Sequence, residues 1–195
     1  LEKVSEMAGR LRAEGLENPF VLFSYYNPIF KMGLGKAARL SRENGVNSWL
    51  VVDVPLEESG EISGELEKNG IGLVPLASPM SDDARVRGIS ESGSGFLYYV
   101  TVAGVTGARK SLPAEFAERL ARVRAASKLP VAAGFGISSP EMAHSAALSA
   151  DAVVVGSALV DLAFRECREN GEDSALAAAS EFVRSLSEAM QRHSR

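Results

Sequence analysis

The stretch AAGFGISSPE, residues 132–141, places two glycines around an aromatic residue, between an apolar run and a helix-start signal. Gly134 and Gly136 indicate either a tight left-handed turn or a close approach to the main chain, because glycine alone tolerates both readily. The residues that follow predict a helix, with Ser139 as its N-cap and Pro140 at its first position. The stretch is therefore typical of a strand that passes into a helix through a glycine corner.

The same strand-then-helix order repeats along the chain. Six apolar runs predict buried strands, and amphipathic stretches between them predict helices, an alternation that gives a parallel sheet. The runs are PFVLFSYY (19–26), SWLVVDVP (48–55), GLVPLAS (72–78), GFLYYVTV (95–102), LPVAAGFG (129–136) and DAVVVGSALV (151–160).

A closed barrel of this class has eight strand–helix units in about 250 residues. This chain has six apolar runs in 195 residues and opens on a predicted helix, Leu1–Glu14. We therefore expect an α/β fold, a (β/α)8 TIM barrel that is incomplete with about six parallel strands, forming a single domain over residues 1–195. An open doubly wound sheet is the alternative that the motifs disfavour.

The charge, cysteine and histidine content of the chain argue against several kinds of partner and site. The formal net charge is −4 and no basic stripe stands out, which argues against a nucleic acid or an anionic membrane as partner. Cys167 is the only cysteine, so an internal disulfide is excluded and a reducing compartment is expected. The two histidines, His144 and His193, are far apart, so no metal site is predicted.

Two glycine corners suggest a phosphate site. The last two predicted strands end at Gly134–Gly136 and at Gly156-Ser157. In barrels of this class a phosphate often lies over these two loops, where backbone N–H groups and a helix N-terminus attract it. A third glycine-bearing loop, residues 103–110, suits a mobile lid, in which Thr106 and Gly107 could touch substrate.

Five ordered segments resemble the tryptophan synthase α subunit, the indole-3-glycerol-phosphate lyase. The segments are FSYYNPIF (23–30), VVDVPLEES (51–59), VAGVTGARK (102–110), GFGISSPE (134–141) and VVGSALV (154–160). The resemblance implies a barrel that cleaves indole-3-glycerol phosphate into indole and glyceraldehyde 3-phosphate. It also implies an α2β2 complex with a β subunit that carries pyridoxal phosphate, so no cofactor is expected in this chain.

The resemblance assigns roles by matching position. The substrate phosphate would rest on the main chain around Gly107, Gly134, Phe135, Gly136, Gly156 and Ser157. The indole ring would lie among Phe23, Leu50, Leu76 and Val154, whose apolar character suits a flat aromatic group. Tyr98, Asp53, Tyr25 and Thr106 would support the reacting centre. Asn27, Pro28 and Pro55 would fall in loops on the β-subunit docking face.

The family's two proton carriers, a glutamate and an aspartate, belong to a first two-strand portion that these residues do not include. Positioned acid–base groups contribute roughly 10²–10⁴-fold each, so the chain as given is expected to be nearly inactive. Asp53 is the carboxylate at a strand end over the site, and the resemblance makes it an orienting residue. Two alternatives stay open: another phosphate-binding barrel isomerase or epimerase, and a non-catalytic partner of a β subunit.

Overall fold

The computed structural model describes residues 1–100, 115–134 and 136–191. The chain divides into two compact units, and each is treated by itself below. The first unit contains Leu1–Ala77 and Ala84–Leu97, and the second contains Ser78–Asp83 and Tyr98–Arg195. Thr106, Gly107, Phe135 and the tail from residue 192 lie outside the described residues.

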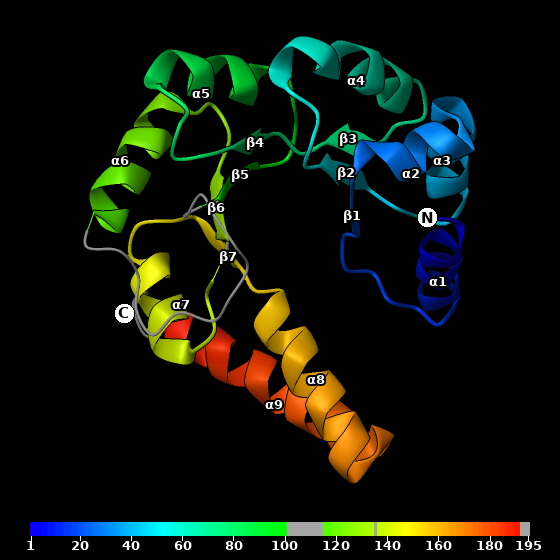
Figure 1. The fold of residues 1–195 in the computed structure, drawn as a ribbon, viewed down its shortest axis with the longest axis vertical. Coiled ribbons are helices and arrows are strands. Elements are labelled where there is room, and N and C mark those ends of the chain that lie inside the picture. The colour runs from blue at the N-terminus through cyan, green and yellow to red at the C-terminus, as the bar shows by residue number, and fades with distance from the viewer. Residues whose placement is uncertain (101–114, 135, 192–195) are drawn as a thin grey trace. The chain divides into compact units, whose positions relative to one another are not determined.

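The first unit is a parallel sheet with helices packed on it (Figure 1). Its sheet has the order β1-β2-β3, with Phe23 of β1 opposite Leu50 of β2 and Trp49 of β2 opposite Leu73 of β3. The strands are β1 (Val21–Ser24), β2 (Ser48–Val51), β3 (Gly72–Leu73) and the short β4 (Leu76–Ala77). The helices are α1 (Glu2–Ala13), α2 (Tyr26–Met32), α3 (Leu34–Glu43), the 3-10 turn η1 (Leu56–Glu58), α4 (Ser59–Lys68) and α5 (Asp83–Glu91). The first residue of α5 is assigned to the second unit.

The core of the first unit lies between the sheet and its helices. Trp49 is its largest fully buried side chain, and its indole N–H donates to Ser41 Oγ at 3.0 Å, so the polar atom is satisfied. Alternate strand residues point to this core, as a sheet covered by helices requires. The cluster consists of Leu22, Ile29, Ala37, Ala38, Val46, Trp49, Val51, Ile62, Leu66, Ile71 and Leu73.

The second unit has the same strand-then-helix order. Strand β6 lies between β5 and β7, and β6 and β7 are parallel, with Gly134 opposite Val154. Helices α8 and α9 pack side by side, and α7 also contacts α9 (Figure 1). The elements are β5 (Leu97–Val100), α6 (Phe116–Ala126), β6 (Val131–Gly134), α7 (Pro140–Ala147), β7 (Ala152–Val154), α8 (Ser157–Asn170) and α9 (Glu172–Gln191). The first residue of β5 is assigned to the first unit.

Three sequence predictions need correction. The apolar run 151–160 is not all strand, because β7 ends at Val154 and Ser157 begins α8. Asn27 and Pro28 lie in the first turn of α2 rather than in a loop, since a helix tolerates proline where the backbone N–H has no intrahelical partner. The run 72–78 forms two short strands separated by Val74 and Pro75.

Candidate active site

The carboxyl ends of β5, β6 and β7 carry the predicted phosphate residues of the second unit. Gly134 ends β6 and lies opposite Val154, the last residue of β7. Because parallel strands end at one edge of a sheet, the two glycine corners start side by side. The corners that the sequence predicts on successive strands are therefore neighbours here.

The close approach of the Tyr98 ring requires a glycine at position 134. A Cβ built on Gly134 would lie 2.3 Å from Tyr98 Oη and 2.5 Å from two ring carbons of Tyr98. Real Cβ atoms essentially never come so close, so the ring of Tyr98 occupies the space that a side chain would need. Burial raises the pKa of Tyr98, so its phenol stays protonated at neutral pH.

Tyr98 and Tyr99 point to opposite sides of β5, as alternation along a strand requires. The Tyr98 ring lies against Gly134. Burial raises the pKa of Tyr99, and the nearby positive charges of Arg119 and Arg122 on α6 reduce that rise. Tyr98 is therefore the member of the pair on the side of the glycine corner.

The backbone conformation at position 136 requires a glycine. Its φ is +78°, in the left-handed region that glycine adopts without strain. The chain then enters α7, where Ser139 Oγ accepts a hydrogen bond from the Met142 N–H at 3.3 Å and Pro140 takes the first helical position. A hydrogen bond from Ser139 lowers the pKa of Glu141. The two glycines of the corner thus serve different purposes.

The second corner leads directly into α8. Gly156 is the N-cap residue and Ser157 is the first helical residue, and both are exposed. No side chain of the described residues caps this helix, whereas Ser139 caps α7. The N-terminus of α8 therefore presents N–H groups and the positive end of its dipole at the carboxyl end of β7.

The apolar residues predicted around indole divide between the units. In the first unit, Phe23 and Leu50 are opposite each other and share the sheet face that does not carry the helix-packed core. Phe23 is 59% exposed and Leu50 is 2% exposed, while Leu76 in β4 is half-buried. Val154 belongs to the second unit, where it is half-buried.

Asp53 is engaged with the start of α2. Its Oδ1 accepts a hydrogen bond from the Tyr26 N–H at 2.7 Å, so its negative charge lies at the positive end of that helix. Tyr25 is the N-cap residue of α2 and is 62% exposed. The carboxylate thus orients a neighbouring segment, and its part in a reaction stays a prediction.

A hollow of about 730 Å³ opens beside Asp53 in the first unit. Its lining includes Asn27, a predicted β-subunit contact, while the exposed Pro28 and Pro55 adjoin the lining residues in sequence. Four carboxylates and two aromatic rings face it: Asp53, Glu57, Glu58, Glu61, Tyr26 and Phe30. This hollow was not predicted from the sequence, although the run of acidic residues after β2 indicates a negatively charged surface there.

Comparison with known proteins decides the family. The family model of the tryptophan synthase alpha chain matches residues 1–191. The chain belongs to the tryptophan synthase alpha chain family. It is similar to the tryptophan synthase alpha chain of Citrifermentans bemidjiense, with 46% identity over 82% of this chain and 60% of the relative. It is also similar to that of Caulobacter sp. (strain K31), with 40% identity over 95% of this chain and 68% of the relative.

Solved structures agree with this family. A tryptophan synthase alpha chain from Legionella pneumophila matches with a TM-score of 0.86 and 32% identity, over 96% of this chain and 68% of that one. A chain from a structural study of the tryptophan synthase α2β2 complex of Pyrococcus furiosus matches with a TM-score of 0.78 and 30% identity, over 93% of this chain and 70% of that one. The predicted fold class, an incomplete (β/α)8 barrel with parallel strands, is confirmed.

The chain spans about three-fifths of the length of the first alpha-chain relatives it matches, at 60% of each. Among the described residues, no helix is long and apolar enough to cross a membrane. In the same described ranges, no three histidine, cysteine or carboxylate side chains are grouped so as to hold a metal ion. His144 lies in α7 with its Nδ1 2.9 Å from the Ala189 carbonyl oxygen of α9.

Proposed function

We propose that these 195 residues form part of an α chain that cleaves indole-3-glycerol phosphate to indole and glyceraldehyde 3-phosphate in tryptophan biosynthesis. The observation that carries the proposal is the family match over residues 1–191, together with two adjacent glycine corners that open into helix N-termini. The family match favours this lyase over a sugar-phosphate isomerase or epimerase.

In this proposal the second unit binds the phosphate. The dianion accepts hydrogen bonds from backbone N–H groups at the corners around Gly134–Gly136 and Gly156-Ser157. The open N-terminus of α8 and the positive φ of Gly136 support that role. Phe135 and Gly107, from the predicted set, complete it from outside the described residues.

Tyr98 is assigned to the glycerol part of the substrate. A buried phenol with a raised pKa remains a neutral hydrogen-bond donor at the pH of the cell. Its ring is held against Gly134, so its hydroxyl is positioned by packing. Thr106, outside the described residues, is assigned to the reacting centre by the resemblance. Asp53 orients the start of α2 and is not assigned a proton-carrying role.

The indole part is assigned to apolar residues. In the first unit, Phe23 and Leu50 present a shared face, and the exposure of Phe23 leaves a ring surface for stacking. Leu76 and, in the second unit, Val154 are assigned to the indole ring by the resemblance, which assigns Tyr25 to the reacting centre. The two acid–base carboxylates of the family are not among these residues, so the isolated 195-residue polypeptide is expected to bind a substrate analogue and not to turn over substrate.

The proposal includes a β chain as partner in a cytoplasmic α2β2 complex, with pyridoxal phosphate on the β chain and no cofactor on this one. The match to the Pyrococcus furiosus α2β2 complex supports this part. The contact surface would include Asn27, Pro28 and Pro55.

A charge placed at the α8 N-terminus tests the phosphate site. In Ser157→Asp the new carboxylate interacts favourably with the helix dipole, so the melting temperature is expected to be kept. The same carboxylate repels a phosphate ester, so the affinity for the substrate analogue indole-propanol phosphate is expected to fall about tenfold or more, equivalent to about 1.4 kcal/mol. Ala121→Glu, an exposed change of equal charge in the middle of α6, is the control and leaves affinity unchanged. Equal affinities for the two variants would contradict the proposed site.

Turnover tests the reaction itself. The chain is extended at its N-terminus with the preceding portion of the Citrifermentans bemidjiense α chain, and indole release from indole-3-glycerol phosphate is measured with and without a β chain. The extended chain is expected to release indole, and the 195-residue polypeptide is not. Failure of the extended, folded chain to release indole rejects the proposed activity.

A further inference from the structure

We propose that the hollow beside α2 and α4 receives a basic side chain, a lysine or an arginine, that the β chain inserts on docking. The inference rests on the proposed function for its partner, and it adds the chemistry of the contact. It concerns the first unit alone and is independent of the phosphate corners.

The charge of the hollow is one-sided. Four carboxylates line it, and none of the described lysines or arginines does. Two of them are engaged: Glu57 with Arg85 at 2.8 and 3.1 Å, and Asp53 with the Tyr26 N–H. Within the described part of the chain, Glu58 and Glu61 take part in no ion pair. The hollow therefore has two exposed negative charges that attract a cation.

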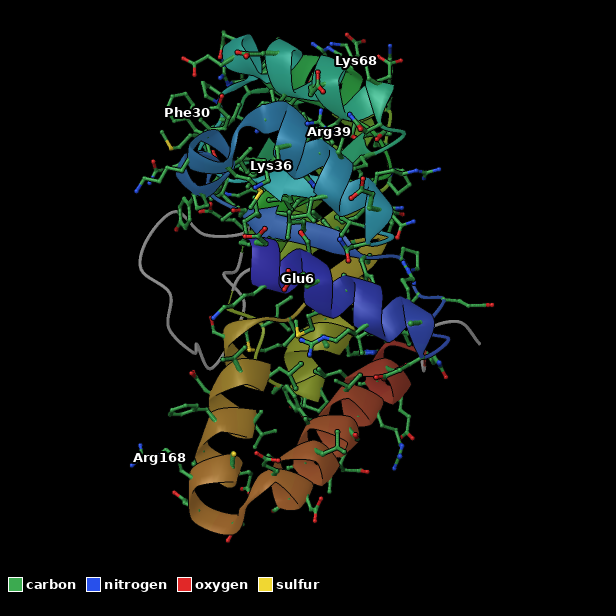
Figure 2. All side chains as sticks on the ribbon, turned by 90° about the vertical axis from the view of Figure 1, so that its right-hand side faces the viewer. Glu6, Phe30, Lys36, Arg39, Lys68 and Arg168 are labelled. Atoms are coloured by element: carbon green, nitrogen blue, oxygen red, sulfur yellow. The ribbon has the colours of Figure 1, made fainter. Side chains whose placement is uncertain are left out.

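The hollow also has an apolar wall that suits a long organic cation. Phe30 is 68% exposed and projects from the end of α2 (Figure 2). Its ring centroid lies 6.0 Å from that of Tyr26, at an interplanar angle of 44°. A guanidinium or ammonium is attracted to an aromatic face, and its methylene stem packs on apolar groups such as Val54 and Ile62 at the base.

Two observations favour a partner's side chain over other occupants. No three acidic, histidine or cysteine side chains of the described residues are grouped tightly enough to bind a metal ion, which disfavours a metal ion as the occupant. Asn27 both lines the hollow and belongs to the predicted docking face, and Pro28 and Pro55 are next to lining residues in sequence. The hollow is thus continuous with the surface on which the β chain is expected.

Charge removal is the first test. Association of the 195-residue chain with the β chain of an organism that has a similar α chain, such as Citrifermentans bemidjiense, is measured by titration calorimetry at 50 and 300 mM salt. Glu58→Gln with Glu61→Gln is expected to weaken binding at least tenfold at low salt and to reduce its salt dependence. Glu43→Gln with Glu67→Gln changes the same charge at exposed positions outside the hollow and is the control.

Filling the hollow is the second test, and it leaves every charge in place. Gly60 and Gly64 both lie in α4, and a Cβ at either meets nothing within 4 Å, but only Gly60 lines the hollow. Gly60→Leu is expected to weaken association at least tenfold, and Gly64→Leu is not. Both changes raise helix propensity, so a loss of binding with an unchanged or higher melting temperature is not a folding defect.

The outcomes separate this inference from the proposed function. If both test variants associate like the wild type, or if the wild-type chain does not associate with the β chain, the inference is rejected. Self-association of the chain that depends on Glu58 and Glu61 also rejects it, because the occupant is then a second copy. In each case the lyase proposal is still tested separately, by the affinity of the wild-type chain and of Ser157→Asp for indole-propanol phosphate.

Discussion

Helices α4 and α8 have similar apolar spacing but different surroundings. In α4, Ile62 and Leu66 are buried against the first-unit sheet. In α8, a helix of 14 residues, no residue is buried, and Val160 and Phe164 are 64% and 65% exposed. An amphipathic pattern thus predicts which side of a helix is apolar, while burial depends on whether another element covers that side.

The strands show the same difference. All four residues of β6 are buried, whereas β7 has an exposed residue and two half-buried ones. Within the described part of the sheet, β6 has a strand on each side and β7 has one only on its β6 side. Among the described residues of the second unit, β7 thus pairs with a strand on one side only, and apolar side chains of α8 such as Val160 and Phe164 are exposed.

Two leucine truncations, one in α4 and one in α9, which packs against α8, extend this comparison of buried and exposed apolar side chains with the largest expected effect. Leu66→Ala removes a fully buried side chain in α4 and is expected to lower the free energy of unfolding by about 2–5 kcal/mol. Leu176→Ala in α9, where the leucine is 69% exposed, should change it by no more than about 0.5 kcal/mol. Urea unfolding is followed by Trp49 fluorescence for Leu66→Ala and by far-UV circular dichroism for both variants. Equal losses would show that the two leucines are similarly buried in solution.

Two glycines at adjacent strand ends give the next effect. Gly134→Ala forces a Cβ into the Tyr98 ring and is expected to cost about 1–3 kcal/mol of stability, with displacement of the ring. Gly156→Ala meets nothing within 4 Å at a φ of −121° and should leave the melting temperature nearly unchanged. Adding Tyr98→Leu to Gly134→Ala should recover part of the loss if the ring is the obstacle. A stable Gly134→Ala variant with Tyr98 in place would contradict this account.

The sequence predicted the order of elements because each strand is a continuous apolar run and each helix is amphipathic. It predicted the capped start of α7 in detail, because Ser139 and Pro140 are local signals. It placed the end of β7 too late, because Val154 to Val160 stays apolar while the backbone changes to helix at Ser157. Hydrophobicity reports burial more directly than conformation.

The reason for each glycine could not be predicted from the sequence. Gly134 and Gly136 look alike in sequence, yet one makes room for Tyr98, more than 30 positions earlier in the chain, and the other adopts a positive φ. The acidic hollow was also hidden, because it gathers Phe30, Asp53 and Glu61 from three separate segments. Long-range contacts of this kind need the fold before they can be seen.

A smaller effect is expected from an arginine that links α1 to the segments before β1 and β2. The Arg12 guanidinium donates to the carbonyl oxygens of Leu16, Asn18 and Gly45 and to Asn47 Oδ1, and it lies 4.1 Å from the centroid of the Phe20 ring. Arg12→Ala should lower stability by about 1–2 kcal/mol, because several hydrogen bonds and a cation–π contact are lost together. Arg168→Ala in the exposed α8, labelled in Figure 2, is the control and should change little. Chemical denaturation measures both, and equal effects would mean that the Arg12 contacts do not hold in solution.

The smallest effect separates two carboxylates with lowered pKa values. A hydrogen bond from Arg85 is the main cause for Glu57 in the first unit, whereas hydrogen bonds from the neutral Asn170 and Ser174 are the main causes for Glu166 in the second. Salt screens the charge of Arg85 but not a neutral donor, so 1 M salt should raise the pKa of Glu57 toward 4.5 more than it raises that of Glu166. Because both folded pKa values lie below the unfolded value, each contact stabilises the fold above pH 4.5 and the contribution is lost as the pH falls through the folded pKa. Carboxyl chemical shifts across a pH titration measure both values, and an equal salt response would show that the Glu57–Arg85 pair does not persist in solution.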